Sequence, residues 1–431
     1  MAEVAAEPRR RARIIGARSR RRPASARVAP PLEHRILMTA TLCLLAFGCV
    51  MVYSASSPIG IFGGGSGTGE FVRYLAFAAI GLAAMLFLER RGLTLLDDRL
   101  IKLILIAALG LLMIVLVPGF GVDVNGARRW FAAGPIQFQP SELAKLALVL
   151  YAARYLGDHP KWLAHGFRRA IAPIAVFVAP ACLMIVLEPD MGTALAVAVT
   201  IGALLLAAGM PPRQLGMLAA GGAGLVLLLA LARPYEGARL SSFLHPWAVA
   251  QGNGFQEVQG QIALGSGGLF GVGLGKSVQK VYWLPEAQTD FILAVVGEEL
   301  GVLGICGVIF LYGMIAYAGL RTARRAATRY AKLLATGLTS LILCQGILNI
   351  FVVLGLAPLT GVPLPFISYA PTNLCVMLAS VGLLLNISRP GARRLRVVEA
   401  PAGDADADRD RRRRDRRSHR ARAGGGRRAA G

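Results

Sequence analysis

The sequence predicts an all-α integral membrane protein, a polytopic bundle of about ten transmembrane helices with one large extracytoplasmic loop. Hydrophobic residues make up 55% of the 431-residue chain. They gather in runs of about 17–22 residues, the length that a helix needs to cross the core of a bilayer. These runs lack the polar face at helical period that a helix of a soluble protein carries. A membrane protein is therefore expected, and a soluble core is not.

Ten apolar runs are expected to be the spans. They cover residues 36–55, 71–89, 101–118, 141–156, 170–187, 191–209, 214–232, 289–318, 331–356 and 365–387. The eighth is too long for one straight crossing, so we expect it to extend beyond the bilayer.

Lysine and arginine residues predict the orientation. With ten spans, one side of the membrane receives both basic tails and the loops that carry Arg90, Arg91, Arg99, Arg154, Lys161, Arg168, Arg169, Arg213, Arg321, Arg324, Arg325, Arg329 and Lys332. An excess of positive charge in short loops marks the cytoplasmic side. The net charge of +23 is thus mostly a topology signal, and it favours contact with anionic membrane lipids. Nucleic acid is not an expected partner, because the basic residues adjoin spans and lack interleaved aromatic residues.

Three regions follow from this pattern. Residues 1–35 and 390–431 are low-complexity, basic segments that cannot bury a core, so we expect disordered cytoplasmic tails. Residues 36–389 form the transmembrane domain, and its large extracytoplasmic loop covers residues 233–288. The six cysteines form no CxxC pair, and the five histidines are scattered, so neither suggests a metal site.

The large loop contains a glycine-rich segment from Gln259 to Gly275. Long loops tend to be functional, and glycine allows a ligand to approach the backbone closely. Ser266 and Gly267 are therefore candidate substrate contacts, with a merely flexible loop as the alternative. The part from Gly271 to Ser277 is similar to the GxxxxGK[ST] pattern of a phosphate-binding loop. However, Phe270 stands where the first glycine of that pattern should be.

Carboxylates lie at the edge of the eighth span, where an acidic segment containing Glu286 and Asp290 runs into the apolar run. Ionisable groups at this depth are costly and usually functional. A second pair, Glu142 and Lys145, lies on one face of the fourth span at i, i+3 spacing.

Several segments, in an order that spans roughly residues 35–390, resemble the SEDS family of polytopic proteins (FtsW, RodA and SpoVE). The matching segments are Gly126–Phe131, Gln139–Lys145, Leu187–Thr193, Phe243–Trp247, Gly265–Gly275, Leu284–Phe291, Gly297–Gly301 and Pro363–Tyr369. Leu-Pro-Glu-Ala followed by Gly-Glu-Glu, with Phe-Leu-x-Pro-Trp upstream, looks like the division branch, FtsW, more than the elongation branch, RodA.

The resemblance implies a peptidoglycan glycosyltransferase at the outer face of the bacterial cytoplasmic membrane, at the division septum. Such proteins polymerise lipid II, an undecaprenyl-pyrophosphate-linked disaccharide-pentapeptide. They work with a class B penicillin-binding protein and other divisome proteins. The residue that matches the family's catalytic aspartate is Asp290. The chain departs from the family at Ala370–Asn373, where Gly-Gly-Ser-Ser is usual, and at Gln288, where a histidine is usual.

The chemistry of inverting glycosyl transfer assigns roles to the candidate residues. The acceptor hydroxyl needs a base, and the departing pyrophosphate needs positive charge. Asp290 suits the base, because apolar surroundings raise the pKa of a carboxyl toward the working pH. A helix N-cap is the alternative role for Asp290. Arg128 and Arg129 suit pyrophosphate, with solvated loop charges as the alternative.

The remaining candidates have two interpretations each. Glu142 and Lys145 either contact the substrate or a metal ion near the outer mouth of the site, or form a structural salt bridge. Glu286 either contacts the substrate or binds a divalent cation, Mg²⁺ or Mn²⁺, together with Asp290. Asp190 is expected to cap the sixth span rather than to act in catalysis.

Three rival functions stay open. A lipid II flippase would need polar residues along a whole translocation path, whereas here they crowd toward one face. A non-catalytic scaffold could dispense with Asp290. An elongation-type, RodA-like polymerase would share the chemistry and differ in its cellular role.

Overall fold

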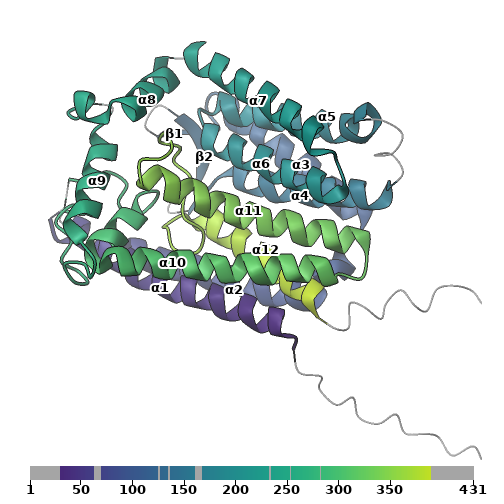
Figure 1. Cartoon of the computed structure of the whole chain (residues 1–431), viewed down its shortest axis with the longest axis horizontal. Coiled ribbons are helices and arrows are strands. Elements are labelled where there is room, and N and C mark those ends of the chain that lie inside the picture. Colours follow the sequence, from purple (N-terminus) through teal and green to yellow (C-terminus); the bar gives the residue numbers. More distant parts are fainter. Residues whose placement is uncertain are drawn as a thin grey trace, which may run out of the picture. The chain divides into compact units, whose positions relative to one another are not determined.

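Ten long helices coincide with the ten predicted spans in the computed structural model, which describes residues 30–62, 69–124, 127–133, 136–160, 167–232, 234–252, 254–281 and 283–389. They are α1 (Leu32–Phe62), α2 (Gly69–Leu95), α3 (Asp98–Leu116), α4 (Pro140–Asp158), α5 (Phe167–Leu187), α6 (Met191–Ala208), α7 (Pro212–Ala232), α10 (Ile292–Arg325), α11 (Arg329–Val353) and α12 (Pro371–Ser388). Figure 1 shows these helices along the described chain.

Seven of the helices in the described ranges are long and apolar enough to cross a membrane: α1, α2, α3, α6, α10, α11 and α12. The segment Ile171–Leu187 of α5 is a shorter apolar helix. The prediction of a polytopic helical membrane protein is confirmed. Most of the two predicted tails, residues 1–29 and 390–431, lies outside the described residues. The first helix begins at Leu32, so it includes the last residues of the predicted N-terminal tail.

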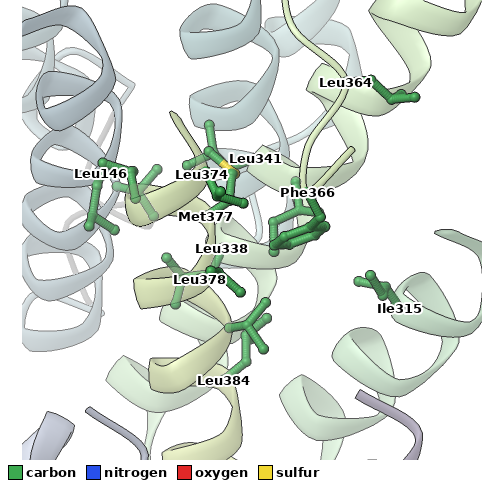
Figure 2. Packing of buried hydrophobic residues seen from close by; sticks show 14 of the residues in the cluster. Leu146, Ile315, Leu338, Leu341, Leu364, Phe366, Leu374, Met377, Leu378 and Leu384 are labelled. Carbon is green, nitrogen blue, oxygen red and sulfur yellow. The ribbon is translucent and has the colours of Figure 1, made fainter. Parts of the chain in front are cut away.

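The core lies where α11 and α12 pack among α1, α2, α4, α6 and α10. Leucine side chains of α11 and α12 meet there, as Figure 2 shows for Leu338, Leu341, Leu374 and Leu378. The contact between α2 and α12 is especially close. A Cβ on Gly382 would lie 2.5 Å from the carbonyl oxygen of Met85. Small residues allow such backbone approach in membranes, where packing rather than water exclusion drives association.

A small antiparallel sheet fills the loop between α3 and α4, where only loop was expected. Its strands are β1 (Val122–Val124), β2 (Ala127–Ala133) and β3 (Ile136–Phe138), in the order β1-β2-β3. Phe131 of β2 pairs with Phe138 of β3. Strands β1 and β3 have only three residues each, and the sequence of β2, Ala-Arg-Arg-Trp-Phe-Ala-Ala, does not alternate apolar and polar residues, so no period-2 pattern indicated them.

The predicted extracytoplasmic loop is largely helical within its described residues. It contains α8 (Pro234–Leu244), the 3-10 helix η1 (Pro246–Val249) and α9 (Phe255–Gly267). Its glycine-rich segment continues from α9 and packs against an interruption in α10 at Gly301, which has φ +67° and ψ −163°. The eighth predicted span is thus two helical pieces joined at this glycine.

The glycine-rich segment satisfies the backbone groups that the interruption frees. The amides of Val272 and Gly273 donate to the carbonyls of Glu298 (2.9 Å) and Glu299 (3.0 Å), and the amide of Val302 donates to Gly268 (3.0 Å). Unpaired backbone groups are very costly at membrane depth. A structural role therefore accounts for the glycine density of this segment.

Buried carboxylates anchor the same region through hydrogen bonds and an ion pair. The Glu299 carboxylate accepts from Lys280 Nζ (2.7 Å) and from the Ser54 hydroxyl of α1 (2.7 Å). The neighbouring Glu298 carboxylate accepts from the Ser277 hydroxyl and from the Val278 amide (2.9 Å). Both glutamates are buried. Each is therefore explained as an anchor for the loop that leads to Asp290.

Candidate active site

A cavity of about 510 Å³ lies at the ends of several helices and brings three of the predicted site residues together: Arg129, Glu286 and Asp290. Its walls come from the start of α2, strand β2, helix α8, the turn before α10, the segment between α11 and α12, and the start of α12. Its charged lining residues are Glu70, Arg73, Arg129, Arg239, Glu286 and Asp290. Three carboxyl groups thus share the cavity with three guanidinium groups. Such a pocket suits a substrate that carries both hydroxyl groups and negative charge.

Asp290 lies in the turn just before α10, with its side chain partly buried in the cavity wall. The N-cap of α10 is Phe291, and no side chain among the described residues caps it. The geometry therefore gives Asp290 no capping role. Burial raises the pKa of the Asp290 carboxyl to about 7, and the neighbouring Glu286 carboxylate adds to the rise. A carboxyl with this pKa can take up a proton near neutral pH.

Glu286 lies one turn before Asp290, and Thr289 links the two. The Thr289 hydroxyl is 2.9 Å from Glu286 Oε2 and 3.2 Å from Asp290 Oδ1. Within the described ranges, no group of three or more acidic, histidine or cysteine side chains could hold a metal ion. The two carboxylates fit a Mg²⁺ ion only in the manner of sites where substrate phosphates and water supply the other ligands. A cation at this pair stays a prediction.

Strand β2 separates the two predicted arginines, because successive side chains of a strand point to opposite faces. Arg129 is 8% exposed and lines the cavity, whereas Arg128 is exposed on the other face. The Arg129 guanidinium donates from Nε to the Glu188 carbonyl (2.9 Å) and from Nη2 to the Pro189 carbonyl. Arg129 is thus held in place by the turn between α5 and α6.

Two further arginines of the cavity, Arg73 and Arg239, were missed by sequence reasoning. Arg73 lies in the first turns of α2, and Arg239 lies in α8, where its Nη1 donates to the Leu359 carbonyl (3.4 Å). Neither stands in a segment that matched the family. The only feature of the sequence that could have indicated them is that each is an arginine near the outer end of a predicted span.

The predicted pair Glu142 and Lys145 lies outside the lining of the cavity. Lys145 Nζ is 2.7 Å from Glu142 Oε1, and both side chains are almost completely buried. Asn373 connects this ion pair to the cavity, because its Nδ2 donates to Glu142 Oε2 (2.8 Å) and to Gln345 Oε1 (3.0 Å). A buried ion pair persists only with such additional hydrogen bonds. The geometry favours the structural salt bridge and assigns a structural use to Asn373, one of the residues that depart from the family.

The rest of that departure also fits the local structure. Pro371 stands in the first turn of α12, where its missing N–H is harmless. The Thr372 hydroxyl accepts from the Gln139 amide (3.2 Å) and lies 3.3 Å from the Gln137 carbonyl, so it joins α12 to β3. At the other departure, the Gln288 carbonyl accepts from the Tyr369 amide (2.9 Å).

Ser266 and Gly267 lie in α9, away from the cavity lining. The Ser266 hydroxyl donates to the Ala263 carbonyl of its own helix (2.9 Å). A Cβ on Gly267 would lie 1.9 Å from the Gly297 carbonyl oxygen, so glycine is needed for α9 to pack on α10. The structure thus gives both residues packing roles and does not bring them to Asp290.

Asp190 is the N-cap of α6, as predicted, and its Oδ1 accepts from the Thr193 amide (3.1 Å). Its neighbour Glu188 is buried, and burial raises the pKa of the Glu188 carboxyl to about 9, with Asp190 adding to the rise. A raised pKa favours the neutral form of the Glu188 carboxyl, and the Glu188 backbone carbonyl accepts a hydrogen bond from Arg129 Nε.

Known proteins resemble this chain over most of its length. A model of the cell cycle protein family FtsW/RodA/SpoVE matches residues 35–392. The chain is 39% identical over 354 residues to stage V sporulation protein E of Bacillus subtilis, covering 82% of this chain and 96% of that protein. It is 40% identical over 357 residues to the probable peptidoglycan glycosyltransferase FtsW of Thioalkalivibrio sulfidiphilus, covering 82% and 88%.

Solved structures share the fold. The rod shape determining protein RodA of Thermus thermophilus aligns with a TM-score of 0.58 at 29% identity, over 84% of this chain and 97% of that one. A chain from a structure on the coordination of polymerization and crosslinking by a peptidoglycan synthase complex aligns with a TM-score of 0.65 at 28% identity, over 84% and 98%.

Proposed function

Because the chain belongs to the FtsW/RodA/SpoVE family of cell cycle proteins, we propose that it is a peptidoglycan glycosyltransferase that polymerises lipid II, with Asp290 as the general base. One observation carries this proposal. A Cβ built on Gly361 would lie 3.9 Å from both Arg129 Nη1 and Asp290 Oδ2. A base and a cation thus flank one point of the cavity, as the transfer requires.

The proposed reaction uses these two groups on opposite sides of the bond change. Asp290 accepts the proton of the acceptor sugar hydroxyl as that oxygen attacks the anomeric carbon of the donor. The bond from that carbon to the pyrophosphate breaks, and its electron pair leaves with the pyrophosphate. Arg129 stabilises the developing negative charge, and Arg73 and Arg239 lie in the same cavity to assist. Attack opposite the leaving group inverts the anomeric configuration.

The position of the cavity favours an enzyme over a flippase. Its walls come from the starts of α2 and α12, the turn before α10 and the segment after α11. In the proposed topology, with both termini in the cytoplasm, all of these lie at the extracytoplasmic face. An enzyme that uses exported lipid II needs a polar site at that face, whereas alternating access would need one near the middle of the bilayer.

The proposed topology predicts where a label will react. Glu286 is exposed in the cavity turn, so a membrane-impermeant thiol reagent is expected to label Glu286→Cys in intact spheroplasts. An unsubstituted chain, with its own cysteines within helices, provides the control. Labelling that occurs only after the membrane is permeabilised would reverse the assigned orientation.

The proposed base predicts a pH dependence. The Asp290 carboxyl has a pKa of about 7, and only its ionised form can accept a proton. Polymerisation is therefore expected to fall about tenfold for each unit of pH below that value and to level off above it. Initial rates with fluorescent lipid II between pH 5 and 9 measure this. A rate that stays constant from pH 5 to 7 would speak against Asp290 as the base.

We further propose a class B penicillin-binding protein as the partner, within the divisome at the septum. The described part of residues 244–283 exposes large apolar side chains: Leu244, Trp247, Leu269, Phe270, Val278 and Trp283. Exposed apolar clusters outside spans are typical of protein interfaces. Elongation with a RodA-like partner is the alternative role, and depletion of the protein in cells separates division defects from shape defects.

This partner is expected to raise the polymerisation rate, because its contact with the loop that leads from α9 to Asp290 can favour the arrangement of the site that is active. Phe270 is 77% exposed, so Phe270→Asp should weaken co-purification with the partner while leaving the partner-independent rate unchanged. Full activity of the isolated chain, unaffected by any such partner, would contradict the proposed activation.

A further inference from the structure

Asn349 is a buried amide in the last turns of α11 that holds two parts of the cavity wall. Its side chain is 1% exposed, and Nδ2 donates to the backbone carbonyl of Asp290 (2.6 Å) and to that of Val362 (2.9 Å). Each hydrogen of the amide group is thus used on a different segment. One segment is the turn that carries Asp290, and the other carries Leu359, Gly361 and Pro363 of the cavity wall.

These two contacts determine how the turn of Asp290 lies relative to the segment that carries Gly361. Gly361 lies near both Asp290 and Arg129, and its φ of +69° belongs to a region that glycine adopts readily. Asn349 therefore fixes the backbone of Asp290 relative to the segment that carries Gly361. The turn from Pro285 to Asp290 contains no helix of its own, and contacts from other elements hold it, Asn349 at Asp290 and the Tyr369 amide at Gln288.

We propose that Asn349 is a positioning residue for Asp290, tying the turn of the general base to the segment that carries Gly361. This inference rests on the proposed function. It concerns geometry alone: Asn349 does not line the cavity, so it acts on the reaction only through Asp290 and the wall. Catalysis is sensitive to such placement, because a displacement of about 1 Å can cost on the order of 10²-fold in rate.

The test compares variants of the whole chain, purified with its partner and supplied with fluorescent lipid II. Asn349→Leu keeps the branching at Cγ and removes both donors. Asn349→Asp keeps the shape but can donate one hydrogen at most. For both we expect kcat to fall about 10- to 100-fold with little change in KM. In Asn349→Asp the carboxyl must be protonated to donate and so carries no charge, and the acid limb of the rate profile should therefore stay in place in both variants.

Tyr312→Phe is the matched control. The Tyr312 hydroxyl is buried and donates to the Pro365 carbonyl (2.5 Å), so it holds the segment between α11 and α12 without touching Asp290. Its removal should leave kcat and the pH profile near those of the unsubstituted chain. Equal losses in Tyr312→Phe and the Asn349 variants, or a change in KM alone, would overturn the positioning role. If Asn349→Leu fails to fold, Asn349→Asp alone decides the question.

Asp290→Asn in the same series separates the positioning role from the proposed function. If Asp290→Asn polymerises normally, the proposed function fails, whatever the Asn349 variants do. If Asp290→Asn is inactive while both Asn349 variants keep the normal kcat, only the positioning role fails.

Discussion

Asp290→Asn is expected to reduce lipid II polymerisation by on the order of 10²–10⁴-fold, the usual cost of losing a general base. Asparagine keeps the size of the side chain and can still bond to the Thr289 hydroxyl, which lies 3.2 Å from Asp290 Oδ1. It cannot accept a proton as a carboxylate does. Folding should survive, because Asp290 is not the N-cap of α10. Gel analysis of the glycan chains measures the loss.

Glu286→Gln is the matched control for that experiment, since Glu286 is the other carboxylate of the same turn. It should lower the pKa of Asp290, whose ionisation Glu286 opposes, and so move the acid limb of the profile to lower pH. Near-normal polymerisation by a well-folded Asp290→Asn protein would show that another residue is the general base. Glu286 is the next candidate in the cavity.

Arg129→Ala is expected to lower kcat/KM by on the order of 10²-fold, because it removes a buried guanidinium from the cavity. Arg129→Lys should recover only part of this loss. A lysine cannot reproduce the two directed hydrogen bonds to the turn of Glu188 and Pro189. Steady-state rates at several lipid II concentrations give kcat/KM for each variant.

Arg128→Ala supplies the control, because the neighbouring side chain lies on the opposite face of β2 and outside the cavity lining. It should change kcat/KM by less than about threefold, in line with other exposed charges. Equal losses from the two substitutions would show that the sheet as a whole, and not the cavity arginine, matters for the reaction.

The spans could be predicted from sequence because each apolar run forms its hydrogen bonds within one helix. The pair Glu142 and Lys145 could be predicted for the same reason, since i, i+3 spacing on one helix brings side chains together. By contrast, the interruption of α10 at Gly301 could not be predicted, because the backbone groups that it frees form hydrogen bonds with the distant residues Gly268–Gly273.

The site was predictable only in part. Asp290 and Glu286 were found together because they lie in one segment. Arg128 and Arg129 were predicted as a pair, and the unforeseen strand separates them. The role of Asn349 could not be predicted, because an amide within an apolar run acquires a role only from the two chain segments that fold against it.

Polymerisation by the purified chain itself is the most direct test of the proposed glycosyl transfer. Fluorescent lipid II is incubated with the whole protein and with its Asp290→Asn variant, each alone and with a class B penicillin-binding protein whose crosslinking serine is removed. The proposed mechanism predicts a ladder of glycan chains with the unsubstituted protein, stronger with the partner, and none with Asp290→Asn. Absence of chains in every sample, together with movement of intact lipid II across a vesicle membrane, would contradict it and identify a flippase.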